Sequence, residues 1–122
     1  MKPLTPEDIL APLTWPTETL EIPEWGGTVT VRGLSGTELD EFNTSVIRQK
    51  GNNVEVNRRN YRAKLVARCL VNGDGKTPLF KDEGQIVALG MQPVKILDRI
   101  LEVVNRLNGT TDEEQEELIK NF

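Results

Sequence analysis

Residues 20–38 read LEIPEWGGTVTVRGLSGTE, and this stretch carries the clearest fold signal in the chain. Apolar and polar residues alternate on both sides of the pair Gly26-Gly27, which is typical of two half-buried β-strands. Glycine adopts positive φ without steric cost, so the pair predicts the turn of a hairpin over about 17–32. Ser35 and Glu38 have the spacing of a capping box, which predicts a helix directly after the hairpin.

Bulk properties limit the classes of protein that this chain can represent. It has 122 residues, one cysteine and a formal net charge of −4, and its length suits one domain. The acidic balance argues against nucleic acid as a partner, because phosphate binding requires a surplus of Lys and Arg. The segment Met1–Glu7 is polar, and no apolar run approaches the ~18 residues of a membrane helix. We therefore expect a soluble protein of a reducing cytoplasm.

Beyond the hairpin the sequence predicts mainly helices. Caps, apolar spacing and breakers place these helices over about 6–10, 36–49, 56–71, 82–90, 93–107 and 111–122. The segment Lys50–Asn53 is expected to be a mobile loop. Strands followed by helices predict an α+β fold, with an N-terminal β-hairpin and a bundle of about four to five helices. The chain divides into an arm with a short helix (1–16), a single α+β domain (17–110) and a C-terminal acidic amphipathic helix (111–122).

The segment 93–107 is the most apolar of the predicted helices. It carries two neighbouring apolar stripes, the first made of Ile96, Ile100, Val103 and Leu107 and the second of Leu97, Leu101 and Val104. Such a wide apolar arc predicts contact on two sides of the helix. The second contact could be the core of the domain or a groove for a partner.

The chain offers no residue set for catalysis, a cofactor or a metal. It contains no histidine, the commonest general base and metal ligand. Cys69 falls on an apolar helix face and is expected to be a core residue. The sequence Gly75-Lys76-Thr77 resembles the end of a phosphate-binding loop, but Leu70 stands where that loop requires glycine. A simple turn is the better interpretation.

One predicted helix carries a concentration of positive charge. Its basic residues are Arg58, Arg59, Arg62, Lys64 and Arg68. This face could be solvated, pair with the acidic segment 112–117 of the same chain, bind an acidic protein or, least consistently with the net charge, bind nucleic acid.

The order of these motifs resembles the tail assembly chaperones of long-tailed bacteriophages and prophages. In that family a strand, a Val-Arg-Gly-Leu segment and a capped helix precede an arginine-rich helix, a turn rich in Asn, Asp and Gly, and a short helix ending in Leu-Gly. The matching segments here are IPEWGG (22–27), VTVRGLSG (29–36), YRAKLVAR (61–68), VNGDG (71–75), VALG (87–90) and the helix over 96–107. The resemblance covers roughly residues 17–118.

The resemblance implies a protein that is not an enzyme. It implies that the domain 17–110 binds and solubilises the tape-measure protein in the host bacterial cytoplasm, helps recruit tail tube subunits during virion morphogenesis, and is absent from the mature virion. It also implies weak self-association. A C-terminally extended form, made by programmed frameshifting, would contact the tail tube protein.

A chaperone for an amphipathic helical client requires apolar surface of its own. The predicted partner-binding residues lie at the hairpin tip, on the second stripe and in the tail: Trp25, Leu97, Leu101, Val104, Leu118, Ile119 and Phe122. Trp25 could instead pack against a neighbouring helix. Two other classes stay open, namely a structural minor tail or head–tail connector protein of a phage particle, and a small enzyme or nucleic-acid binder.

Overall fold

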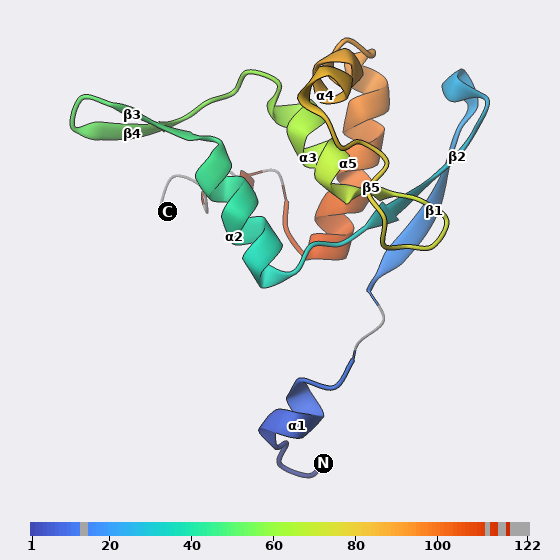
Figure 1. Cartoon of the computed structure of the whole chain (residues 1–122), viewed down its shortest axis with the longest axis vertical. Helices are drawn as coiled ribbons and strands as arrows, with labels where there is room; N and C mark the ends of the chain where they lie inside the picture. The colour runs from blue at the N-terminus through green and yellow to red at the C-terminus, as the bar shows by residue number, and fades with distance from the viewer. Residues whose placement is uncertain (13–14, 112, 115–116, 118–122) are drawn as a thin grey trace.

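A computed structural model describes residues 1–12, 15–111, 113–114 and 117. Helices and strands both contribute, so the α+β class is confirmed (Figure 1). The helices are α1 (Pro6–Ile9), α2 (Gly36–Ser45), α3 (Tyr61–Cys69), α4 (Glu83–Gly90) and α5 (Val94–Asn108). The strands are β1 (Thr17–Ile22), β2 (Gly27–Arg32), β3 (Ile47–Lys50), β4 (Asn53–Val56) and β5 (Leu70–Val71).

The predicted N-terminal hairpin is present and belongs to a small antiparallel sheet. β1 pairs with β2, so that Leu20 lies opposite Val29, and β2 pairs on its other edge with β5. The connection between β1 and β2 is a short 3₁₀ turn over Pro23–Trp25, closed by Gly26 at φ +74°. That positive φ explains one glycine of the pair, while Gly27 already belongs to β2.

A second hairpin replaces part of two predicted helices. α2 ends at Ser45 and α3 starts only at Tyr61, and the residues between them include the antiparallel pair β3–β4. Gly51 at φ +62° makes the turn, and Arg48 pairs with Glu55 across the strands. The helix predictions over 36–49 and 56–71 were therefore too long. Figure 1 shows this hairpin projecting away from the packed helices.

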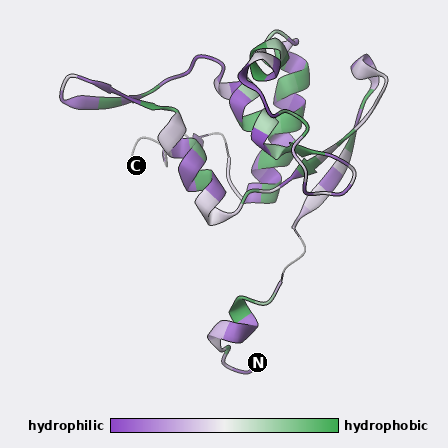
Figure 2. Ribbon diagram, viewed as in Figure 1, coloured by the Kyte–Doolittle hydropathy of each residue, from purple (hydrophilic) through white to green (hydrophobic). Residues whose placement is uncertain are grey.

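Helix α5 lies between two packing partners. It packs against α3 on one side and against β1 and β2 on the other. Both of its apolar stripes consequently lie in the core, with Leu97, Leu101 and Val104 all buried. Figure 2 shows the hydrophobic residues that α3, α4 and α5 contribute. The predicted contact on two sides is confirmed, and the second stripe is a packing surface within the domain.

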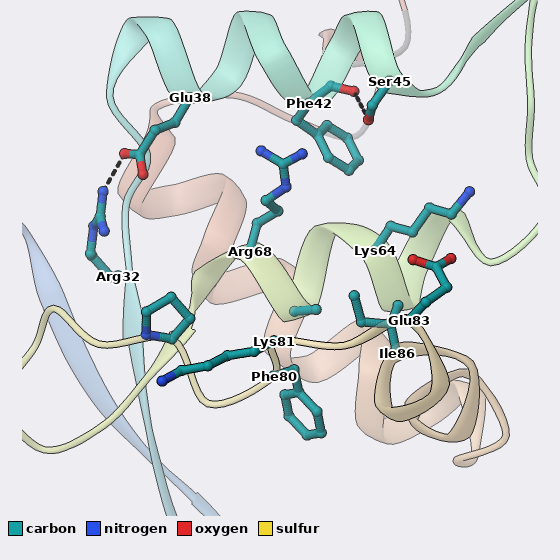
Figure 3. Close-up of a pocket in the computed structure, with 12 residues that line it drawn as sticks. Arg32, Glu38, Phe42, Ser45, Lys64, Arg68, Phe80, Lys81, Glu83 and Ile86 are labelled. Atoms are coloured by element: carbon teal, nitrogen blue, oxygen red, sulfur yellow. Dashed lines mark hydrogen bonds and ion pairs between the residues drawn. The ribbon is translucent and has the colours of Figure 1, made fainter.

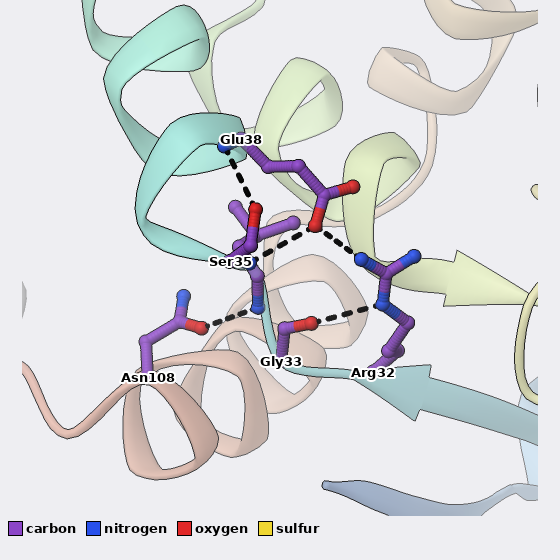
Figure 4. Close-up of polar contacts among 6 residues, drawn as sticks. Arg32, Gly33, Ser35, Glu38 and Asn108 are labelled. Carbon is purple, nitrogen blue, oxygen red and sulfur yellow. Dashed lines mark hydrogen bonds and ion pairs between the residues drawn. The ribbon is translucent and has the colours of Figure 1, made fainter. Parts of the chain in front are cut away.

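A polar network joins the end of β2 to the start of α2 (Figure 4). The predicted capping box is confirmed, since the Glu38 N–H donates to Ser35 Oγ at 3.1 Å and the Ser35 N–H donates to Glu38 Oε1 at 2.9 Å. The buried Arg32 guanidinium donates to the same Glu38 oxygen and, at 3.1 Å, to the Gly33 carbonyl. One carboxylate thus caps the helix and neutralises a buried arginine.

The same junction is tied to the C-terminal end of α5. The Leu34 N–H donates to Asn108 Oδ1 at 2.9 Å (Figure 4), and the Gly33 N–H donates to the Pro16 carbonyl at 2.9 Å. A Cβ atom on Gly33 would lie 3.1 Å from Pro16 Cγ. The glycine in the Val-Arg-Gly-Leu segment therefore permits close approach of two chain segments.

The C-terminal acidic helix falls largely outside the described residues. Thr111 and Glu114 make the predicted capping contacts, because the Glu114 N–H donates to Thr111 Oγ1 at 3.1 Å. The predicted partner-binding residues Leu118, Ile119 and Phe122 lie outside the part of the chain that the structure describes.

Candidate functional site

The run IVAL (86–89) makes the second half of helix α4 apolar on every side, although only one side of it is covered. It begins after Asp82, whose side chain accepts from the Gln85 N–H at 2.8 Å, as the sequence predicts. Leu89 is buried, and Gly90 packs so closely on Asn60 of the α3 N-terminus that a Cβ there would overlap the Asn60 side chain. A helix that is hydrophobic all round is normally buried on all sides. The uncovered side of α4 is thus a candidate binding surface.

The uncovered side presents large apolar side chains to solvent. Val87 is 48% exposed and Met91, directly after the helix, is 83% exposed. These two residues are four positions apart and lie on the same side of the helix. Together with the residues of the adjacent hollow they form what we call the α4 surface: Trp25, Phe80, Gln85, Val87, Ala88, Leu89, Met91 and Gln92.

The hollow beside α4 has a volume of about 330 Å³ and is bounded by the hairpin tip. The Trp25 indole N–H donates to Gln92 Oε1 at 3.0 Å, which satisfies the only hydrogen-bond donor of that side chain. Trp25 is half-buried and packs against the core, and its indole also borders the hollow. The two interpretations of Trp25 are therefore compatible, because one part of the ring packs internally and another lines an open apolar site.

An ion pair fixes the hairpin tip over α5. Arg99 donates to both carboxylate oxygens of Glu24, at 2.9 Å and 2.7 Å. These hydrogen bonds, followed by one from the Glu24 backbone, lower the pKa of Glu24 from 4.5 to about 2. Because Trp25 follows Glu24 in the chain, the pair also holds one wall of the hollow in place.

Changing Glu24 to glutamine is expected to lower the melting temperature near neutral pH. The folded-state pKa of Glu24 is depressed, so its contribution to stability is present above pH 4.5 and is lost as the pH falls towards about 2. The difference in melting temperature between wild type and variant should therefore shrink over that interval. Thermal unfolding followed by circular dichroism across this pH range measures it. A difference that is constant with pH would show that the ion pair does not stabilise the tip.

The other residues predicted to bind a partner are not part of this surface. Leu97, Leu101 and Val104 are buried between α3 and the sheet, so a partner cannot reach them in this conformation. Of the two contacts left open for this stripe, the structure shows the core of the domain and not a groove for a partner. The exposed residues Val87 and Met91 were missed. The uniformly apolar sequence IVAL between Asp82 and Gly90 was the signal that could have identified them.

The groups singled out for possible chemistry are structural. Cys69 is buried, and burial raises the pKa of its thiol to about 12. Asp74 accepts hydrogen bonds from the Lys76 N–H, the Thr77 N–H and the Thr77 hydroxyl at 2.6–2.9 Å, and the Thr77 bonds are the main cause that lowers its pKa to about 2. The sequence Gly75-Lys76-Thr77 is thus a turn organised by Asp74, as predicted. The described residues contain no cluster of three or more His, Cys, Asp or Glu suited to a metal.

The basic residues predicted to share one helix face are divided between two places. α3 begins at Tyr61, so two of the five residues precede the helix. Arg62 Nε donates to Asp98 of α5 at 2.8 Å. Lys64 and Arg68 line a separate pocket next to α2. The single basic face expected from the sequence is therefore absent from the described part of the chain.

Comparison of the chain with protein-family models, with curated proteins and with solved structures gives no match. Within the described ranges 1–12, 15–111, 113–114 and 117, no helix combines the length and the apolar character that crossing a membrane requires.

Proposed function

We propose that this protein is a phage tail assembly chaperone that binds an amphipathic helical segment of the tape-measure protein on the α4 surface. The observation that carries the proposal is the uncovered apolar side of α4 beside an apolar hollow. The order of sequence motifs, which resembles this chaperone family, supports the choice of client.

The α4 surface has the features of a helix-binding site. A client helix presents apolar residues at spacings of three and four, and one of them could fill the hollow between Trp25 and Ala88 while its neighbours contact Val87 and Met91. Tryptophan is enriched among residues that dominate binding energy, and the flexible methionine side chain adapts to varied partners. The Glu24–Arg99 ion pair already holds the hairpin tip in place. Binding therefore loses less conformational entropy in ordering the tip.

In this proposal the chaperone keeps the tape-measure protein in solution in the host bacterial cytoplasm until tail tube subunits polymerise around it. The tail tube protein is then a second partner, contacted through a C-terminally extended form. The chaperone self-associates weakly, performs no catalysis and is absent from the mature virion.

Co-expression with the tape-measure protein tests this function directly. The wild-type chain is expected to keep the client soluble and to co-purify with it. Changing Val87 and Met91 together to lysine should weaken binding by about tenfold or more, because both exposed apolar contacts beside the hollow are lost. Both side chains are exposed, and lysine suits the C-terminal end of a helix, so the melting temperature should change little.

The matched control is Val54 changed to lysine, since Val54 of β4 is also exposed and lies outside the α4 surface. This variant is expected to bind like wild type. If the wild-type chain neither solubilises nor co-purifies with the tape-measure protein, the function is wrong. If binding is normal in the Val87/Met91 variant, the location is wrong. Mass spectrometry of purified virions separates a chaperone, which should be absent, from a structural minor tail or connector protein.

A further inference from the structure

A second pocket, which shares Phe80 with the α4 surface, lies between α2, α3 and the segment 78–86 (Figure 3). Its volume is about 450 Å³, which is within the range of binding pockets. The apolar side chains of the lining, which we call the apolar floor, are Phe42 of α2, Ala67 of α3, and Phe80 and Ile86 of the segment 78–86. The charged residues of the lining are Arg32, Lys64, Arg68, Lys81, Glu38 and Glu83.

The charges of this basic pocket are unbalanced. Glu38 is bound to Arg32, so Lys64, Arg68 and Lys81 face Glu83 as the one remaining carboxylate of the lining. The Arg68 guanidinium carbon lies 5.9 Å from the centre of the Phe42 ring. Lys64, Arg68 and Lys81 make no ion pair with any residue that the structure describes. The pocket therefore combines an apolar floor with a surplus of positive charge, which suits a segment carrying both carboxylates and apolar side chains.

We propose that the basic pocket receives the C-terminal segment 112–122 of a second copy of this chain. This segment has the complementary chemistry: its acidic residues are Asp112, Glu113, Glu114, Glu116 and Glu117, and its large apolar residues are Leu118, Ile119 and Phe122. Carboxylates would pair with Lys64, Arg68 and Lys81, and an apolar side chain would contact the floor near Phe80.

A second copy fits the structure better than the same chain. Glu113 and Glu114 are exposed, neither lines the pocket, and neither pairs with Lys64, Arg68 or Lys81 of the same chain, so these two residues do not occupy their own pocket. Each copy presents one acidic segment and one basic pocket. Repeated head-to-tail contacts of this kind produce an open chain or a ring of copies, and reciprocal exchange between two copies produces a dimer. Along a long client, such a chain would place successive α4 surfaces close together and increase avidity.

Analytical ultracentrifugation of the full chain, without any client, tests this contact. The average mass should increase with protein concentration, and the increase should weaken as NaCl rises from about 0.05 to 0.5 M. A pocket variant, Lys64→Gln with Lys81→Gln, and a segment variant, Glu113→Gln with Glu116→Gln, should each associate about tenfold more weakly. The matched control is Lys50→Gln, which removes a positive charge from an exposed lysine outside the pocket and should associate like wild type.

Mixing the two variants gives the decisive result. The pocket variant keeps an intact segment and the segment variant keeps an intact pocket, so an equimolar mixture should regain association but stop at a dimer. The proposal is overturned if the average mass of the wild-type chain stays that of a monomer at every concentration, as it would if the segment docked on its own chain. It is also overturned if the mixture of the two variants does not associate. No tape-measure protein takes part, so these outcomes are separate from those that test client binding.

Discussion

Changing Leu101 to aspartate is expected to unfold the domain. Leu101 is 6% exposed on α5, which packs between α3 and the β1–β2 strands. Truncating a buried leucine to alanine costs ~2–5 kcal/mol, and burying an unpaired carboxylate adds several more. Since domains are stable by only ~5–15 kcal/mol, the free energy of unfolding should fall by at least ~4 kcal/mol.

Urea unfolding followed by circular dichroism measures this effect. Changing Leu101 to methionine is the matched control, because the volume is conserved and the cost should stay below ~1.5 kcal/mol. If the aspartate variant retained wild-type stability, Leu101 would be outside the core and its stripe would again be open to a partner.

Changing Arg32 to leucine is expected to cost ~2–3 kcal/mol of folding free energy. Arg32 is 8% exposed, donates to Glu38 and to the Gly33 carbonyl, and its guanidinium lies 4.0 Å from the centre of the Trp15 ring. Removing it leaves a half-buried carboxylate and a buried carbonyl without their donor. This loss of folding free energy is smaller than the loss expected on breaking a fully buried ion pair, because the Glu38 side chain is partly exposed.

A double-mutant cycle with Glu38→Gln isolates the ion pair from the packing of Arg32. Glutamine keeps an acceptor for the Ser35 N–H, so the helix cap is largely retained. We expect a coupling energy of about 1 kcal/mol or more. Lysine at position 32 should restore little, because it cannot donate in two fixed directions. A coupling energy near zero would show that Arg32 acts only through packing.

The elements that could be predicted are those specified by neighbouring residues. Gly26 requires positive φ, and Ser35 and Glu38 satisfy each other within one helical turn, so the first hairpin and the start of α2 follow from local sequence. The β3–β4 hairpin could not be predicted from local sequence in this way. The helical spacing of Leu39, Phe42 and Val46 continues the pattern of α2, and Gly51 was interpreted as a loop between helices. Pairing across Arg48 and Glu55 decides the structure there, and such pairing depends on context.

The location of the candidate site could not be predicted, because it depends on which helix faces the tertiary packing leaves uncovered. The stripe of Leu97, Leu101 and Val104 was correctly recognised as a second contact face, but whether the sheet or a partner covers it is decided by tertiary packing. Conversely, α4 has the composition of a buried helix, and only the fold shows that Val87 and Met91 are left uncovered. For Trp25 the packing against the core is confirmed, whereas its contact with a partner stays a prediction.

Hydrogen–deuterium exchange of the chain with and without the tape-measure protein tests the central claim most directly. We expect the client to slow exchange in α4 and in the residues that follow it up to Gln92, together with the hairpin tip around Trp25. Helix α5 should change little, because its apolar residues are already buried. A stable complex in which protection is confined to the β3–β4 hairpin or to α2, with α4 unaffected, would contradict the account.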